Sequence, residues 1–177
     1  MAKINRGSIT FPHLKIRKQR IMLQRETKPY FTYIYRRLVK SLIEEKEISN
    51  WDLKIAGQCF KNFDLRDVNS LPGFKNYFGK SSYSATITIA KLSGEFLINL
   101  GQIGEVAELK VNGKLVGRTI EQNSTFAITP FLKVGPNKIE IETVNNLAIK
   151  IQDPESQFGI IPPAGLIGPV KLKIYQG

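Results

Sequence analysis

Residues 104 to 117 read GEVAELKVNGKLVG, and this stretch decides the fold. Apolar and polar residues alternate on both sides of Asn112-Gly113, which is typical of two half-buried antiparallel strands. Asn-Gly is favoured in a two-residue type I′ turn because both positions need positive φ. We therefore predict a hairpin that sends apolar side chains into the interior between two sheets. These side chains are Val106, Leu109, Val111, Leu115 and Val116.

Alternation of the same kind runs from Trp51 to the C-terminus, with turn residues at intervals of about eight to twelve positions. The expected strands are 83–90, 94–101, 107–113, 114–120, 124–130, 137–145 and 169–176. Gly135-Pro136-Asn137 and the segment ITPFL (128–132) are expected to form turns, and the second to bury Phe131 and Leu132. Residues 157–169, QFGIIPPAGLIGP, are predicted to be a long irregular loop. No helix-length segment interrupts the strands, which favours an antiparallel sandwich over a parallel sheet.

The N-terminal part of the chain follows a different pattern. Residues 1–28 are densely charged, and their apolar spacing does not choose between helix and strand. From Pro29 apolar residues recur at three- and four-residue steps up to Ile43, as an amphipathic helix requires, and Ser49-Asn50 is expected to end that helix. We therefore divide the chain into a basic, partly helical extension over 1–50 and a β-sandwich domain over 51–177.

Charge and composition exclude several function classes. The 177-residue chain carries a net charge of +11, and residues 1–50 hold twelve Lys/Arg against four Glu. With one cysteine, Cys59, and one histidine, His13, the chain has neither an internal disulfide framework nor a zinc motif. No run of about 18 apolar residues could span a bilayer. No secretory signal is visible, so the protein is expected to be cytoplasmic if the chain is complete.

A family resemblance covers roughly residues 51–175. The ordered segments YSATITI (83–89), INLGQIGEVAELKVNGKLVG (98–117), FAITPFLKVGPNKIEIETVNNL (126–147) and GLIGPVKLKI (165–174) resemble the galactose-binding-like jelly rolls of glycoside hydrolases. The domains most similar in pattern are the sugar-binding domain of family 2 enzymes and C-terminal modules of rhamnosidase-type enzymes. The resemblance implies a jelly-roll β-sandwich. It also allows a structural calcium ion, whose oxygen ligands the sequence does not identify; no other cofactor is expected.

Catalytic arrangements are poorly represented in the sequence. A glycosidase needs two carboxyls about 5–5.5 Å or about 6.5–9.5 Å apart. Glu140 and Glu142 would lie about 7 Å apart on one strand face, but the alternating Ile139 and Ile141 place both acids on the wet face. No catalytic residue is therefore assigned. Gly79-Lys80-Ser81-Ser82 resembles the end of a phosphate loop but lacks the required earlier glycine.

Binding a sugar requires fewer groups than cleaving a glycosidic bond. It requires an aromatic face on which the sugar ring stacks and a few polar groups that hydrogen-bond its hydroxyls. The candidates lie around the expected loops, and each aromatic has the alternative interpretation of a core side chain. The predicted carbohydrate-binding residues are Tyr77, Phe78, Tyr83, Arg118, Asn123 and Asn145.

These observations favour a noncatalytic carbohydrate-binding or scaffold domain associated with glycoside hydrolases. Its expected partners are a carbohydrate and a catalytic glycoside hydrolase domain, with no membrane. One alternative is a contributing part of a rhamnosidase- or galactosidase-like enzyme. The other is a basic protein- or nucleic-acid-interaction module, for which the positive charge of residues 1–50 is the only argument.

Overall fold

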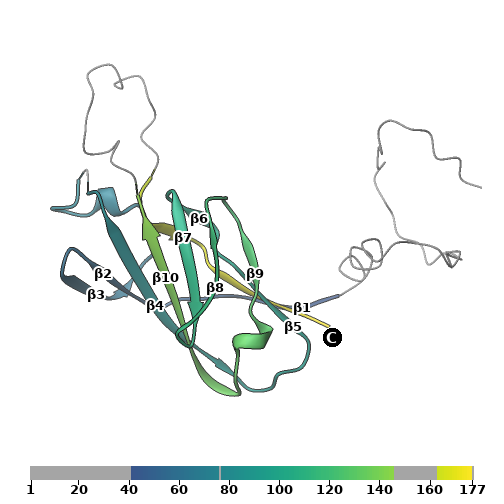
Figure 1. Ribbon diagram of the computed structural model, residues 1–177. Coiled ribbons are helices and arrows are strands. Elements are labelled where there is room, and N and C mark those ends of the chain that lie inside the picture. The colour runs from purple at the N-terminus through teal and green to yellow at the C-terminus, as the bar shows by residue number, and fades with distance from the viewer. Residues whose placement is uncertain (1–40, 76, 146–162, 177) are drawn as a thin grey trace, which may run out of the picture. The chain divides into compact units, whose positions relative to one another are not determined.

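A computed structural model describes residues 41–75, 77–145 and 163–176, and the account of the fold concerns these residues (Figure 1). They form strands joined by turns, with two single-turn 3₁₀ helices, η1 (Val68–Ser70) and η2 (Thr129–Phe131). The strands are β1 (Leu42–Glu47), β2 (Trp51–Ile55), β3 (Gln58–Phe63), β4 (Lys80–Ile89), β5 (Glu95–Asn99), β6 (Gln102–Ile103), β7 (Val106–Val111), β8 (Lys114–Thr119), β9 (Thr125–Ala127), β10 (Gly135–Val144), β11 (Leu166–Gly168) and β12 (Lys171–Tyr175). No helix in this part of the chain is long and apolar enough to cross a membrane.

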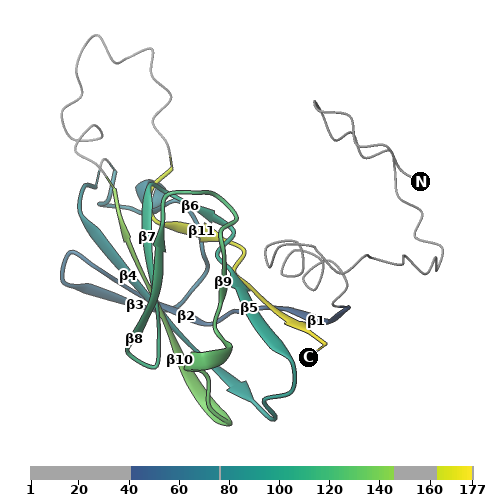
Figure 2. The ribbon, with the colours of Figure 1, turned by 45° about the vertical axis from the view of Figure 1, so that its right-hand side comes forward.

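Two antiparallel sheets make up the body of the fold. The larger sheet has the strand order β3-β2-β4-β10-β7-β8, the smaller has the order β1-β12-β5-β9, and β11 pairs with β6 in a separate short ribbon. Figure 2 shows the two sheets as facing layers. Leu53, Leu109 and Ile141 of the larger sheet share one hydrophobic core with Phe96 and Ile98 of the smaller. The predicted all-β, antiparallel class is therefore confirmed, and the layers form a sandwich.

The two faces of the six-stranded sheet differ because side chains alternate along each strand. On β10, Ile139 and Ile141 are buried, whereas Glu140 and Glu142 lie on the opposite, outer face. Trp51 at the start of β2 is also buried, and its indole Nε1 donates a hydrogen bond to the carbonyl of Ile48. The larger sheet thus has an apolar inner face and a polar outer face.

The predicted hairpin joins β7 to β8, and its turn residues Asn112 and Gly113 have φ of 52° and 77°. Two of its apolar residues were assigned to the wrong face. Val106 is 37% exposed and Leu115 is 46% exposed. The pairing of β7 with β8 shifts register between Leu109 and Lys110, which breaks the regular alternation on which the prediction for Leu115 depended.

Two further expectations are corrected. The helix predicted from Pro29 overlaps β1, which is a strand paired with β12; residues 29–40 lie outside the described residues. Backbone pairing with β12 overrides the helical spacing of Leu42 and Ile43, since periodicity is a weak prior against tertiary context. The segment predicted as an irregular loop contains β11, which pairs with β6, while 157–162 also lie outside the described residues.

The Asn-Gly and Gly-Pro-Asn turns meet at the end of the sandwich where β10 begins. Asn112 Nδ2 donates to Asn137 Oδ1 at 2.8 Å and to the carbonyl of Phe131 at 2.9 Å. Asn137 is fully buried, and its Nδ2 donates to the carbonyls of Lys133 and Gly135. The two motifs that carry much of the family resemblance therefore stabilise the fold, because they satisfy buried polar groups between loops.

Candidate functional site

The upper end of the larger sheet in Figure 1, where β10 finishes, gathers most of the predicted binding residues. Val144, the last residue of β10, pairs with Lys80 on β4 and with Val106 on β7. On the far side of β7, Thr119 pairs with Ala107. The segments that hold Tyr77 and Arg118 are thus brought to the same end of the sheet, although they are about forty positions apart in sequence.

Tyr77, Phe78 and Asn145 are brought together, but they have different roles. Asn145 Oδ1 accepts from the backbone N–H of Gly79 at 2.7 Å, and its Nδ2 donates to the carbonyl of Tyr77 at 2.6 Å. The Tyr77 ring packs edge-on against Phe74, with 5.8 Å between centroids, and its hydroxyl donates to the carbonyl of Lys80. Phe78, the residue after Tyr77, is 38% exposed. Asn145 and Tyr77 therefore hold the loop, and Phe78 is its accessible ring.

Tyr83 lies in the core, with 1% of its surface exposed. Its hydroxyl accepts a hydrogen bond from the backbone N–H of Leu166 at 3.1 Å. Burial raises the pKa of Tyr83 to about 12, so its hydroxyl stays protonated at ordinary pH. A ring in this position is not accessible to a glycan at the surface. The alternation of inward residues along β4 is the sequence signal that could have indicated this.

A shallow hollow of about 420 Å³ lies beside the end of β8. We call it the rim hollow, and it is lined by Val106, Arg118, Thr119, Ile120 and Glu121. Ile120 is 74% exposed, so the hollow combines apolar surface with charged and hydroxyl groups. That combination of an apolar surface with a few polar groups is the usual character of a small-molecule site. Val106 and Ile120 were not among the predicted binding residues.

Arg118 is held in place by Glu108 on the neighbouring strand. The Arg118 Nε donates to Glu108 Oε2 at 2.6 Å, and the ammonium of Lys110 lies 2.8 Å from Glu108 Oε1. The hydrogen bonds from Lys110 and Arg118 hold the pKa of Glu108 below its usual range. Glu108 is therefore ionised at neutral pH and is not suited to donate a proton as a general acid.

Asn123 lies in the exposed turn between β8 and β9, with φ of 56°. Its backbone carbonyl accepts from Asn99 Nδ2 at 2.6 Å, and its backbone N–H donates to the carbonyl of Gly101. The backbone of this turn is thus fixed against the segment that follows β5. Asn123 is placed near the upper end but does not line the rim hollow.

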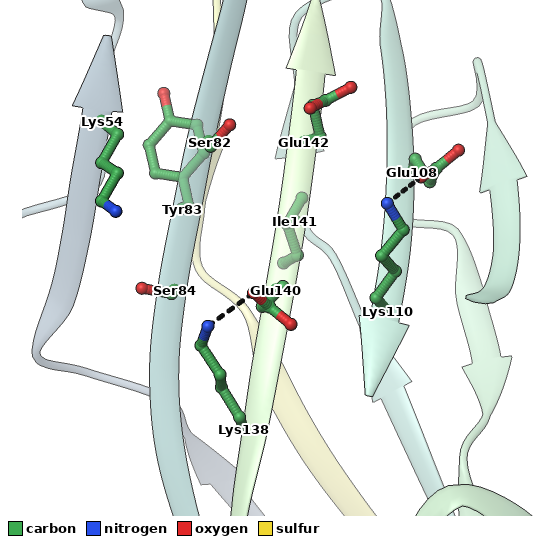
Figure 3. A pocket seen from close by; sticks show the side chains of 10 residues that line it. All are labelled: Lys54, Ser82, Tyr83, Ser84, Glu108, Lys110, Lys138, Glu140, Ile141 and Glu142. Atoms are coloured by element: carbon green, nitrogen blue, oxygen red, sulfur yellow. Dashed lines mark hydrogen bonds and ion pairs between the residues drawn. The ribbon is translucent and has the colours of Figure 1, made fainter. Parts of the chain in front are cut away.

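A second depression lies on the outer face of the larger sheet, above β4 (Figure 3). We call it the outer-face trough; its volume is about 140 Å³. It is lined by Lys54, Ser82, Tyr83, Ser84, Glu108, Lys110, Lys138, Glu140, Ile141 and Glu142. Figure 3 shows charged side chains on either side of the short serines. The trough is not predictable from the sequence, because the order of strands in a sheet is not visible in the alternation pattern.

The carboxylates that were weighed as a catalytic pair line this trough. Glu140 is ion-paired with Lys138 at 2.6 Å, and Glu142 with Lys80 at 2.9 Å. Both lie on the polar outer face, as the alternation predicted. Within the described ranges no group of three or more His, Cys, Asp or Glu side chains could hold a metal ion.

Comparison with known proteins supplies the context of the fold. No family model matches the chain. A candidate beta-glucuronidase of Formosa agariphila is 30% identical over 77 residues, which is 41% of this chain and 7% of that protein. The rhamnosidase of Novosphingobium sp. PP1Y matches in structure with a TM-score of 0.64 and 20% identity, over 88% of this chain and 16% of its own. The fold is one that occurs within glycoside hydrolases.

Other solved glycoside hydrolases match in the same way. The GH2 beta-galacturonidase of Eisenbergiella tayi has a TM-score of 0.57 and 17% identity, over 76% of this chain and 25% of its own. The beta-D-glucuronidase of Dictyoglomus thermophilum has a TM-score of 0.56 and 21% identity, over 75% of this chain and 28% of its own. The resemblance stated from the sequence is confirmed at the level of fold. This chain spans about a quarter or less of most of these proteins.

Proposed function

We propose that this chain acts as a noncatalytic, carbohydrate-binding jelly-roll domain of glycoside hydrolase type. The observation that carries the proposal is the combination of fold and coverage: the sandwich matches a small part of several solved glycoside hydrolases. A domain that forms a minor part of such enzymes supports binding or scaffolding more readily than bond cleavage. Fold alone does not establish function, and the chemistry of the surface supplies the second line of support.

That chemistry supports binding rather than hydrolysis. The outer-face acids Glu140, Glu142 and Glu108 are each ion-paired with at least one lysine or arginine. A glycosidase instead keeps one carboxyl in an environment that raises its pKa, so that it can protonate the leaving group. The charged groups of this face are therefore better suited to hydrogen-bond sugar hydroxyls than to cleave a glycosidic bond.

The proposed site for a sugar is the upper end of the larger sheet. Phe78 supplies an accessible aromatic ring, Ile120 supplies apolar surface, and Arg118 supplies a donor fixed by its bond to Glu108. Aromatic and apolar surfaces pack against the C–H bonds of a sugar ring, and fixed polar groups orient its hydroxyls. Of the residues predicted from sequence, Phe78 and Arg118 keep this direct role in the proposal.

A glycan array probed with the full chain, followed by calorimetry on the hits, tests this proposal. We expect weak binding of at least one glycan, and Phe78→Ala should weaken it by about 1 kcal/mol, the contribution expected of an aromatic contact. Lys75→Ala is the matched control, since Lys75 is exposed in the same loop and should leave binding unchanged. An array without hits would refute carbohydrate binding and leave a scaffold role.

The scaffold role is the second candidate, and a specific observation favours it. Val106, Ile120 and Phe78 are all large apolar residues exposed at the same end of the sheet. Apolar surface gathered in one place often marks contact with another protein or domain. On this alternative the upper end would pack against the remainder of a glycoside hydrolase, the chain would bind no glycan on the array, and Ile120→Asp would disrupt the association between the two domains.

A further inference from the structure

Five cross-strand partners on the outer face form one polar row that crosses the larger sheet. Lys54 on β2 pairs with Ser82 on β4, and Ser82 pairs with Glu142 on β10. Glu142 pairs with Glu108 on β7, and Glu108 pairs with Arg118 on β8. We call this row the transverse track. It joins the outer-face trough, which contains its first four members, to the rim hollow, which contains Arg118.

The length of the track sets the size of ligand that could follow it. Neighbouring strands lie about 4.8 Å apart, so the four steps from Lys54 to Arg118 span about 19 Å. That distance exceeds the size of a single sugar ring and suits an extended chain. The Arg118–Glu108 ion pair bridges the boundary between the trough and the hollow, so the polar surface is continuous between them.

The two serines create the depth of the trough. Ser82 and Ser84 lie on the outer face of β4, and the strands on either side carry long charged side chains, including Lys54 and Glu140 (Figure 3). β2 and β10, which flank β4, are about 10 Å apart. Because the two serine side chains are short and the charged side chains on either side are long, the trough has space for the rings of a sugar chain.

The charges along the track indicate the chemistry of the ligand. Glu142 is ion-paired with Lys80, and Glu108 is ion-paired with Lys110 and Arg118, so a fully charged ligand would have to separate existing pairs. A sugar hydroxyl both donates and accepts, so it can bond a lysine and a glutamate that remain paired. The track thus presents a hydroxyl and two paired carboxylates between a cationic donor at each end, and this combination suits an uncharged polyhydroxylated chain.

We propose that the transverse track binds an uncharged oligosaccharide chain that lies across the strands, from Lys54 in the outer-face trough to Arg118 at the rim hollow. The proposal rests on the carbohydrate-binding function proposed above and assigns it a second surface and a ligand class. It differs from a site at the upper end alone, because it requires the trough above β4 to remain open.

Calorimetric titration of the full chain with cellohexaose, xylohexaose and mannohexaose tests the proposal, with hexagalacturonate as an acidic comparison. The double variant Ser82→Ile/Ser84→Ile fills the trough without changing net charge. The matched control is Thr86→Ile, because Thr86 is the next outer-face residue of β4 and does not line the trough. We expect at least one neutral hexasaccharide to bind the unaltered chain. The filled variant should bind it at least about tenfold more weakly, and Thr86→Ile should bind it with unchanged affinity.

Three results would overturn the proposal. They are failure of all three neutral oligosaccharides to bind, equal affinity for the filled variant and the unaltered chain, and tighter binding of hexagalacturonate. If the filled variant does not fold, Lys54→Ala takes its place, with a severalfold loss of affinity expected and unchanged affinity counting against the track. Array hits retained in full by the filled variant would refute the track while leaving the proposed function intact, and hydrolysis of a bound glycan would refute the noncatalytic function itself.

Discussion

Asn137 shows how one polar residue determines the geometry of a whole loop end. Its side chain is fully buried and takes part in four hydrogen bonds, with Asn112 and with backbone groups of Lys133 and Gly135. Replacing it with alanine would leave several buried donors and acceptors without partners, each at a cost of about 1–3 kcal/mol. The family-like Gly-Pro-Asn turn is thus a requirement of stability.

We expect Asn137→Ala to lower the free energy of unfolding by about 2–4 kcal/mol. Urea denaturation followed by circular dichroism measures this difference. Thr88→Ala is a suitable control because Thr88 is exposed on β4, and a surface change of this kind stays within about 0.5 kcal/mol. An Asn137→Ala variant as stable as the control would contradict the structural role of the network.

Gly117 is required for close approach of two strands at the edges of the two sheets. A Cβ atom at this position would lie 2.7 Å from Cε1 of Phe126, which is closer than carbon atoms pack. We expect Gly117→Ala to destabilise the fold by about 1–3 kcal/mol through overpacking. Thermal denaturation of Gly117→Ala, Phe126→Leu and the double variant tests the contact. If the cause is this clash, the double variant is more stable than the sum of the single effects predicts.

β1 shows how an edge strand is kept from pairing with other chains. It pairs only with β12 among the described strands, and all six of its residues are exposed. Glu45 forms ion pairs with Lys171 and Lys173 of β12. Charged side chains on both faces of an edge strand discourage edge-to-edge association. The exposed backbone edge of β1 therefore does not by itself indicate a dimer interface.

The pairing of β7 with β8 should depend on pH through Glu108. The pKa of Glu108 is lowered in the folded state by its hydrogen bonds with Lys110 and Arg118. This contribution to stability is present above the usual pKa of about 4.5 and is lost as pH falls through the lower, folded-state value. The melting temperature of Glu108→Gln should therefore lie below that of the unaltered chain at pH 7, and the difference should shrink at acidic pH. A difference that stays constant across this range would show that the ion pairs contribute nothing.

Seven of the strands were predictable from sequence, and in β4, β7 and β10 the two-residue alternation corresponds to one buried face and one more exposed face. β2 and β3 were not among the expected strands, and β6 and β11 were missed because they are short and lie among glycines and prolines. The helix predicted through Ile43 was wrong over β1, where strand pairing prevailed. At the candidate site, strand ends bring Phe78 and Arg118 to one end of the sheet, and their role in binding stays a prediction. The burial of Tyr83 follows from the alternation along β4, whereas the trough depends on which strands are neighbours.

At the scale of the molecule, the first question is where the folded domain begins. The predicted sandwich domain starts at residue 51, yet Ile48 is 5% exposed and its backbone N–H donates to the carbonyl of Val170. We expect a fragment over 51–177 to fold as a β protein but to be less stable than one over 40–177, because loss of β1 exposes the edge of β12. Circular dichroism and urea denaturation of both fragments test this. Equal stability would show that β1 is dispensable, and a disordered spectrum for 51–177 alone would show that it is essential.

The net charge of the whole chain is concentrated outside the sandwich. Residues 1–40 hold eleven of the 26 Lys/Arg and one acid. Binding to a generic DNA duplex is therefore expected to be weak and to fall steeply with salt, since it depends on counterion release. Filter binding at two salt concentrations measures this. Tight, sequence-selective binding that persists at physiological salt would favour a nucleic-acid module over a carbohydrate-binding domain.

The fate of a bound glycan tests the central claim of noncatalytic carbohydrate binding most directly. The measurement is prolonged incubation of the full chain with each glycan that it binds, followed by chromatography of the sugar, beside calorimetry on the same preparation. We predict saturable binding and recovery of the glycan intact, because the outer-face acids Glu140 and Glu142 are ion-paired with lysines. Cleavage of the glycan that is abolished by Glu140→Gln or Glu142→Gln would contradict the account and establish a glycoside hydrolase.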